Sequence, residues 1–506
     1  MFKDIQKKLL LKYPLLWNTK FVPMIAIGLL LHIIFFGLGY LDGTIDFSNK
    51  NNIDIEAISI MFGVLINIII TILWLVNYFK NNSLKSFYSK SKYSLFYEWL
   101  QIFIISTLFI TFYLPFSVGK QLHQKSYYSL EETTNRCKTI ATADMFIDGS
   151  FEDTELDSIH KSKLNDEEYN RYLTGEIGVS RDSNYYYFNK DYITFKEKKY
   201  NQFSLLNRNT YEFTVISREQ DSLNKIQVQN WLHQNDQAEV KKLMDNYLSL
   251  IREHNLATNL TLDKWFDIVY KAPKFDEFLY IQPYLKQYET ENSYYYNDYE
   301  TAVAVPEYER KYSKYFAQQD VLKEKYNTVS EAHTDSFFKI EIILGLLYGA
   351  LGLSLLIFSF RTTSGKSWLI ASVTTGIINI IYGIFTVVSR ADMLYFYLII
   401  PTILAIILYF FIICYKKKNL QLSRITLNLL LWSFATIIPI TYFIIIEANR
   451  PDYYDNYALQ QFENRELYDW LNYHIVHMFT INFILSIIIL FFLSKIIRNW
   501  KGIAEN

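Results

Sequence analysis

The sequence predicts a polytopic α-helical membrane protein with eight transmembrane helices, three before and five after one extracytoplasmic domain that is α-rich with a minor β component. Three observations predict this fold class. Eight stretches of about 20 residues contain almost no Asp, Glu, Lys or Arg, and each is long enough to cross a hydrocarbon core of ~30 Å. A polar block separates the third stretch from the fourth. Basic residues also gather in alternate loops between the stretches.

Five segments follow one another along the chain. Residues 1–20 are predicted as a cytoplasmic amphipathic segment, residues 21–119 as the first three membrane helices, and residues 120–341 as the extracytoplasmic domain. Residues 342–494 are predicted as the remaining five helices and residues 495–506 as a cytoplasmic tail. The predicted spans are Phe21–Tyr40, Ala57–Phe79, Trp99–Gly119, Ile342–Phe360, Ser367–Ser389, Met393–Tyr415, Ile425–Ile446 and Trp470–Ser494.

The distribution of basic residues predicts the orientation of these spans. One set of connecting segments, together with both termini, holds 18 Lys and Arg against three acidic residues. The short segments of the other set hold 4 basic and 11 acidic residues. Because basic segments stay on the cytoplasmic side, both termini are expected inside and residues 120–341 outside. This arrangement is expected in the cytoplasmic, or inner, membrane of a bacterial-type cell.

The first segment has the pattern of a cationic amphipathic helix. Phe2, Ile5 and Leu9 recur at helical spacing among lysines, and Pro14 breaks the pattern. Such a helix would lie along the cytoplasmic leaflet. Two interpretations stay open at this point. The segment is either a basic anchor that only fixes topology, or an elbow helix similar to the one that precedes the first span of many ABC-type export permeases.

The predicted domain contains only three Gly and three Pro, which favours a mostly helical structure. Apolar residues at helical spacing predict one amphipathic helix over Ile226–Asn255, and a shorter helix is predicted over Thr261–Tyr270. Tyr192–Lys196 and Tyr211–Ser217 alternate apolar and polar residues. These two pieces are expected to pair as strands.

The exit from the domain is predicted as one long helix over residues 306–341 that runs into the fourth span. Pro306 suits a first helical turn, and neither Pro nor Gly follows before Gly345. Tyrosines and aliphatic residues recur every three or four positions, with one polar gap at Gln319. This helix is either a rigid stalk that transmits movement across the membrane or a passive post.

Composition and motifs exclude several functions. The net charge is −1 and no basic run lies outside the membrane flanks, so no nucleic-acid partner is expected. Cys137 and Cys414 are predicted in the domain and in a membrane helix, so a disulfide between them is not expected. Gly365-Lys366-Ser367 ends like a phosphate-binding loop but lacks the loop's first glycine and a preceding strand. No motif for catalysis or for a cofactor is present, and we expect a protein that is not an enzyme.

The start of the last span holds the one group of candidate metal ligands. His474 and His477 lie three apart, and Asp469 falls near the same helical face. Two histidines at this spacing and a carboxylate could hold a transition metal or relay protons. The alternative is a pair of interfacial histidines that form hydrogen bonds with neighbouring loops. An enzyme that acts on lipid or cell-wall substrates would rest on this group alone.

Polar residues inside the predicted spans are uncharged or weakly ionisable. We expect them to form hydrogen bonds between helices rather than an ion pathway, because no Asp, Glu, Lys or Arg lies within a span. Gly345, Gly349 and Gly352 form a small-residue face that permits close approach of helices, within the chain or between two copies of it. Pro115, Pro401 and Pro439 are expected to kink three spans. The intramembrane polar residues are His32, Asn67, Asn379 and Asn482.

Two functional hypotheses result. In the first, the chain is a non-catalytic, permease-like membrane subunit of an export or envelope-transport assembly, driven by a separate cytoplasmic ATPase. In the second, it is a membrane-anchored receptor or scaffold whose extracytoplasmic domain binds a ligand or an envelope protein. Both place the chain in a lipid bilayer, and both are compatible with a homodimer.

Overall fold

A computed structural model describes most of the chain, namely residues 11–49, 55–80, 93–146, 192–195, 198–201, 213–267, 281–282, 315–391, 393–416, 421–450 and 465–499. The chain forms two compact units. The first, here called the membrane unit, comprises residues 1–39, 55–118 and 337–506. The second, the inserted unit, comprises residues 40–54 and 119–336. The predicted amphipathic pattern at Phe2, Ile5 and Leu9 lies outside the described residues.

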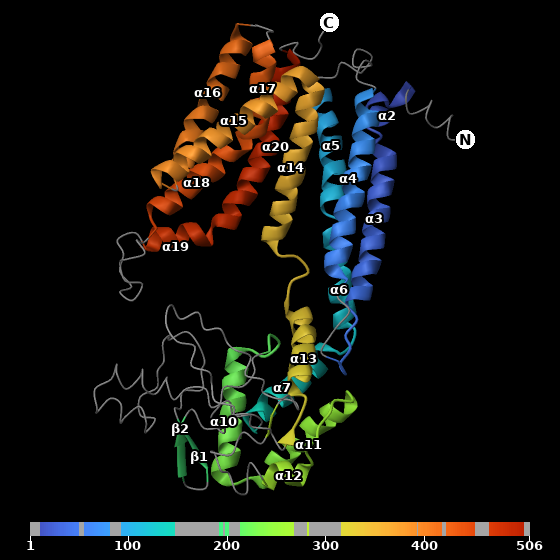
Figure 1. Ribbon diagram of the computed structural model, residues 1–506, viewed down its shortest axis with the longest axis vertical. Helices are drawn as coiled ribbons and strands as arrows, with labels where there is room; N and C mark the ends of the chain where they lie inside the picture. The colour runs from blue at the N-terminus through green and yellow to red at the C-terminus, as the bar shows by residue number, and fades with distance from the viewer. Residues whose placement is uncertain are drawn as a thin grey trace, which may run out of the picture. The chain divides into compact units, whose positions relative to one another are not determined.

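Long apolar helices form the membrane unit (Figure 1). Within the described residues, seven helices are long and apolar enough to cross a membrane, with α17, η7 and α18 counted as one. The bent pair α5 and α6 raises that number to as many as eight. The chain is therefore a multi-pass helical membrane protein. The elements are α2 (Pro14–Asn18), α3 (Phe21–Asp42), α4 (Glu56–Lys80), α5 (Ser94–Ile110), α6 (Tyr113–Lys125), α14 (Ile340–Thr362), α15 (Gly365–Ser389), α16 (Leu394–Tyr415), α17 (Gln421–Ser433), η7 (Phe434–Thr436), α18 (Ile437–Ala448), α19 (Arg465–Tyr473) and α20 (Ile475–Asn499).

Two interruptions lie close to predicted proline kinks. Helices α5 and α6 meet at an angle of 41°, and Pro115 is the third residue of α6, where its missing N–H is tolerated. The 3₁₀ turn η7 separates α17 from α18, and Pro439 is the third residue of α18. Helix α16 instead continues through Pro401 without a break. Proline thus marks two of the interruptions but does not by itself end a membrane helix.

Helix α14 takes part in two buried clusters of the membrane unit. On one side Leu351, Leu355 and Phe358 of α14 belong to the same cluster as Trp99 of α5, Phe410 of α16, Leu427 of α17 and Leu490 of α20. On the other side Ile357 belongs to a cluster with residues of α3, α4 and α5, among them Trp74, Tyr78 and Ile102. Helices α5 and α14 pack along each other, as Figure 1 shows.

The inserted unit is mainly helical within the described residues. Its elements are α7 (Leu130–Ala143), η2 (Asp144–Phe146), β1 (Tyr192–Phe195), β2 (Lys198–Asn201), α10 (Arg218–Gln234), α11 (Gln237–Glu253), α12 (Leu262–Phe266), β3 (Ile281–Gln282), β4 (Tyr315–Phe316) and α13 (Gln319–Thr334). Strands β1 and β2 pair antiparallel, with Tyr192 opposite Asn201, and β3 pairs parallel with β4.

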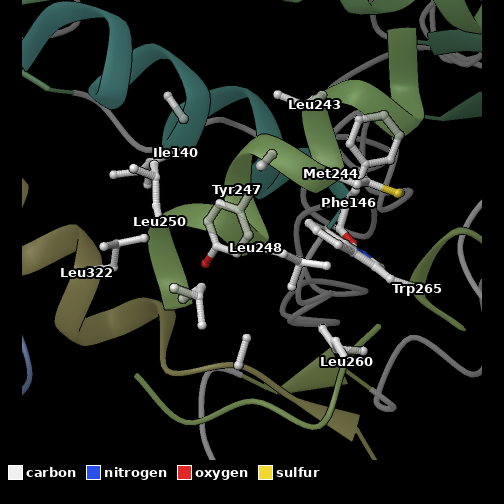
Figure 2. Packing of buried hydrophobic residues seen from close by; sticks show 14 of the residues in the cluster. Ile140, Phe146, Leu243, Met244, Tyr247, Leu248, Leu250, Leu260, Trp265 and Leu322 are labelled. Atoms are coloured by element: carbon white, nitrogen blue, oxygen red, sulfur yellow. The ribbon is translucent and has the colours of Figure 1, made fainter. Parts of the chain in front are cut away.

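One apolar core holds the inserted unit together (Figure 2). Tyr247 of α11 is fully buried among side chains from α7, α12 and α13, and its ring meets the ring of Trp265 edge-on at 5.5 Å. The indole N–H of Trp265 donates to the carbonyl of Phe146 over 2.9 Å. Among the described residues of this unit, helices predominate and the strands are short.

The continuous helix predicted over residues 306–341 is not what the structure has. Residues 315–316 are a strand, α13 ends at Thr334, and Asp335 is extended before α14 begins at Ile340. Thr, Asp and Ser compete for backbone hydrogen bonds and favour a helix end. The amide nitrogen of Gln121 also donates to the carbonyls of Ala332 and Asp335, at 2.9 and 2.7 Å. These bonds satisfy carbonyls that the end of α13 leaves open, and the predicted helix is interrupted between Thr334 and Ile340.

Two smaller predictions in the inserted unit also need correction. The single helix predicted over Ile226–Asn255 is two helices, because Asn235 has a left-handed backbone and Asp236 caps α11 by accepting from the Glu239 N–H. Strand β1 pairs with β2 and not with residues 213–217, the described part of the stretch predicted as its partner. In that stretch Val215 donates its N–H to the hydroxyl of Ser330 in α13 over 2.9 Å.

Candidate functional site

Three buried polar side chains meet inside the membrane unit. The guanidinium Nε of Arg361 lies 2.9 Å from Oε1 of Glu98, and the Tyr78 hydroxyl donates to that same oxygen over 2.7 Å. Arg361 is 2% exposed, Glu98 5% and Tyr78 0%. The guanidinium carbon also lies 5.5 Å from the centre of the Tyr78 ring. Helices α4, α5 and α14 are therefore joined at one charged point, here called the α4–α5–α14 junction.

The ends of three helices bring these residues together. Tyr78 lies in the last turn of α4, Glu98 near the start of α5, and Arg361 in the last turn of α14. A cation is favoured at a helix C-terminus because the helix dipole is negative there. The sequence argument that no charged residue is buried in the bundle is wrong. It assigned Glu98 and Arg361 to connecting loops, whereas both side chains turn into the packed interior.

Neutral hydrogen bonds extend the junction along α14. The indole N–H of Trp99 in α5 donates to the Ser354 hydroxyl over 3.0 Å. The indole N–H of Trp432 in α17 donates to the Ser359 hydroxyl over 2.8 Å. The Thr363 hydroxyl, just after α14, donates to the side-chain carbonyl of Asn428 over 3.0 Å. Helix α14 is thus held on opposite sides by α5 and α17.

The arrangement can hold three helices in one position. A buried ion pair gains less than its desolvation costs unless the geometry is good and other polar groups assist, and here Tyr78 supplies such a group. Removing one partner leaves an uncompensated buried charge. The junction therefore favours a single packing of three helices, and separating α14 from α5 at this point would break the ion pair.

The four intramembrane polar residues predicted from sequence form hydrogen bonds with different partners. Asn482 donates from its amide to the Tyr348 hydroxyl at 2.8 Å and to the Ala435 carbonyl at 2.9 Å, so it bridges α20, α14 and the η7 break. Asn379 accepts from the Tyr395 hydroxyl over 2.5 Å, which joins α15 to α16. Both are hydrogen bonds between helices, as expected from the sequence.

Of the other two intramembrane residues, His32 also contacts a second helix, whereas Asn67 does not. The His32 ring nitrogen on α3 lies 3.4 Å from the Thr111 hydroxyl at the end of α5. The Asn67 amide donates to the Gly63 carbonyl of its own helix over 2.7 Å. Sequence alone could not distinguish a bond within one turn from a bond between helices.

The candidate metal ligands do not converge. The rings of His474 and His477 are 5.5 Å apart, and Nδ1 of His474 lies 2.8 Å from the Trp470 carbonyl. Asp469 pairs with Arg465 over 3.4 Å. Within the described residues no three His, Cys, Asp or Glu side chains lie close enough together to hold a metal ion.

The glycine positions that need close packing are not those predicted. A methyl group at Gly349 would meet Ile110 at an ordinary 3.8 Å, and one at Gly345 or Gly352 would meet no described atom within 4 Å. In contrast, a methyl group at Gly63 would collide with the rings of Phe112 and Phe35. Gly39 likewise approaches the Phe116 carbonyl so closely that no side chain fits. Close helix contact therefore lies among α3, α4 and the bent pair α5 and α6.

A second polar cluster lies in the inserted unit and was also missed from sequence. Arg136 of α7 donates to both carboxylate oxygens of Glu253 at 2.8 and 2.9 Å, and to the Tyr326 hydroxyl at 2.9 Å. His254 Nε2 lies 2.9 Å from the same hydroxyl. Burial raises the pKa of Tyr326 and lowers the pKa of His254. The cluster draws on three parts of the chain that are far apart in the sequence, namely residue 136, residues 253–254 and residue 326, so no spacing pattern could indicate it.

Comparison of the chain with protein-family models, with curated proteins and with solved structures gives no match.

Proposed function

We propose that the protein is a non-catalytic membrane subunit of an export or envelope-transport assembly, driven by a separate cytoplasmic ATPase. In this proposal α5 and α6 form one span, giving eight spans in a bacterial-type cytoplasmic membrane with both termini inside. Residues 120–341 would then lie outside, as the distribution of basic residues predicts. The observation that carries the proposal is the buried Glu98–Arg361 pair.

A buried ion pair of this kind favours a helix bundle that moves during function over a bundle that only anchors the chain in the membrane. Apolar contacts suffice to hold an anchor in lipid, whereas buried charges are costly and, in membrane proteins, mark pathways or moving parts. Helix α5 belongs to the span that precedes most of the inserted unit in the chain, and α14 is the first helix after it. The pair therefore joins the helices on two of the four chain connections through which a force on the inserted unit would reach the bundle.

Site-specific photo-crosslinking in intact cells tests the proposal. A photoreactive residue at exposed Lys366 or at Arg424 would face the cytoplasm in the proposed topology, and one at exposed Arg390 would face the opposite side. We expect an adduct with an ATP-hydrolysing protein from position 366 or 424 and none from position 390. Adducts only with envelope proteins, or ATPase adducts from position 390, would contradict the proposal.

A receptor or scaffold is the second candidate, and the inserted unit supports it. This unit has its own apolar core and an open pocket of about 480 Å³ between α7 and α11, lined by polar residues such as Ser129, Asn135 and Asn246. A receptor needs such a surface but does not need an ATPase. In the crosslinking experiment this candidate predicts envelope partners for probes in the inserted unit and no ATPase adduct at positions 366 and 424.

A further inference from the structure

A second feature of the membrane unit lies apart from the α4–α5–α14 junction. A pocket of about 240 Å³ lies between α15, α16 and the interrupted helix formed by α17, η7 and α18. Since a water molecule's share of liquid volume is about 30 Å³, the pocket has room for roughly eight groups of that size. Six polar side chains line it together with several isoleucines; they are Thr375, Asn379, Tyr395, Thr402, Ser433 and Thr436.

The lining excludes a charged occupant. None of the described residues around the pocket is Asp, Glu, Lys, Arg or His. An ion moved into such a site from water would lose its hydration without gaining a counter-charge. The isoleucines, among them Ile399, Ile403 and Ile406 on α16, provide an apolar wall for a hydrocarbon body.

The threonine and serine hydroxyl groups that line the pocket already donate their hydrogen bonds within their own helices. Thr375 and Thr402 donate to the carbonyls of Ala371 and Leu398 in their own helices, at 3.0 and 2.9 Å. Ser433 and Thr436 donate in the same way at 2.7 Å, next to the η7 break. These hydroxyls can therefore only accept a hydrogen bond from an occupant.

Asn379 supplies the donor that the rest of the lining lacks. Its carbonyl oxygen accepts from the Tyr395 hydroxyl, and no partner for its amide nitrogen lies among the residues that the structure describes. Asn379 is an exposed residue near the middle of α15, and at that depth of a bilayer the hydrocarbon core would supply no water to satisfy its amide. An occupant with a hydrogen-bond acceptor would complete the amide, and a hydroxyl on that occupant could also donate to the threonines.

We propose that this pocket binds an uncharged, lipid-soluble molecule that places a hydroxyl group against Asn379 and a short hydrocarbon body against the isoleucines. The ligand class is thus a neutral amphipathic alcohol that enters from the bilayer. Binding requires only the geometry of α15 to α18, so it does not depend on whether the protein belongs to a transport assembly.

Photolabelling of the full-length protein in lipid nanodiscs tests the proposal. Three probes carry the same diazirine on an eight-carbon chain and differ only in the head, which is a primary alcohol, a carboxylate or a methyl group. We expect the alcohol to label the peptides around residues 375–379, 395–406 and 429–440 at least ten times more than the carboxylate does. The Asn379→Leu variant should reduce alcohol labelling at least fivefold and leave labelling by the alkane unchanged.

A neighbouring substitution provides the matched control. The hydroxyl of Thr374 donates to the Ile370 carbonyl on the same helix, and Thr374 does not line the pocket, so Thr374→Val should label like the wild type. A Thr375→Phe variant, which fills the pocket, should lose labelling by the alcohol while the protein stays monodisperse. Equal labelling by all three probes, labelling confined to other segments, or alcohol labelling that survives Asn379→Leu would each overturn the proposal.

Discussion

The Nε atom of Arg361 lies 2.9 Å from Oε1 of Glu98, and 263 positions of sequence separate the two residues. Both side chains are buried in the membrane unit, and the Tyr78 hydroxyl shares the same carboxylate oxygen. This geometry makes the pair sensitive to the loss of either partner.

Removing one charge should destabilise the protein far more than removing both. We expect Arg361→Met to cost about 3–5 kcal/mol, because Glu98 is then buried without a counter-charge. The double variant Glu98→Gln with Arg361→Met should lose less than half of that, since glutamine still accepts from Tyr78. Thermal unfolding in detergent measures the difference. The exposed pair Arg465–Asp469 is the control, and Arg465→Met should cost no more than about 1 kcal/mol.

Two sets of glycines should respond in opposite ways to alanine. A methyl group at Gly63 or Gly39 would collide with Phe112 or with the Phe116 carbonyl, and such overpacking typically costs about 1–3 kcal/mol. Alanine at Gly345 or Gly352 meets no described atom within 4 Å and should be neutral or slightly stabilising, because alanine favours helix more than glycine. Melting temperatures of the four variants decide the point. A large loss at Gly345 would indicate a packing partner, such as a second copy of the chain.

Replacing each of two buried tyrosines of the inserted unit by phenylalanine should change its stability differently. The Tyr247 hydroxyl is fully buried and has no hydrogen-bond partner among the described residues, whereas the Tyr326 hydroxyl contacts Arg136 and His254. Since an unsatisfied buried polar group costs about 1–3 kcal/mol, Tyr247→Phe should be neutral or stabilising. Tyr326→Phe should be destabilising. Hydrogen exchange of α11 reports the stability of this unit, and equal losses in both variants would contradict the assignment.

The inserted unit should lose stability in mild acid through His254. Burial lowers the pKa of His254 in the folded chain, and the nearby Arg136 lowers it further, although Glu253 opposes both. The unfolded chain therefore binds the proton more readily than the folded one. The stabilising contribution is fully present above the unfolded pKa of about 6.5 and is lost as the pH falls through the folded pKa.

Hydrogen exchange between pH 7.5 and 5, corrected for intrinsic rates, measures this dependence. Protection of α11 should fall across the range in the wild type and change less in His254→Gln. His333→Gln on α13 serves as the control and should keep the wild-type profile. An identical acid loss in His254→Gln would place the pH dependence elsewhere.

Hydrophobic patterning predicted the membrane helices well because an apolar stretch of sufficient length has few other solutions. The same reasoning failed where a residue lies at a span end. Glu98 and Arg361 resemble loop residues in the sequence, and only the packing of α5 against α14 shows that they are buried. The prediction of one long exit helix failed for a local reason. Asp335 ends α13, although the spacing of apolar residues around it suggests that the helix continues.

The separation of Glu98 and Arg361 also has a consequence for how the protein is made. Ribosomes add about 5–20 residues per second, so Arg361 is synthesised roughly 13–50 s after Glu98. During that interval residues 119–336, which make up most of the inserted unit, are produced, and Tyr78 is the one partner of the junction already available to the carboxylate. The nascent chain must therefore hold Glu98 without its arginine partner while the bundle is incomplete. Helices α4 and α5 cannot reach their final packing until α14 has been synthesised.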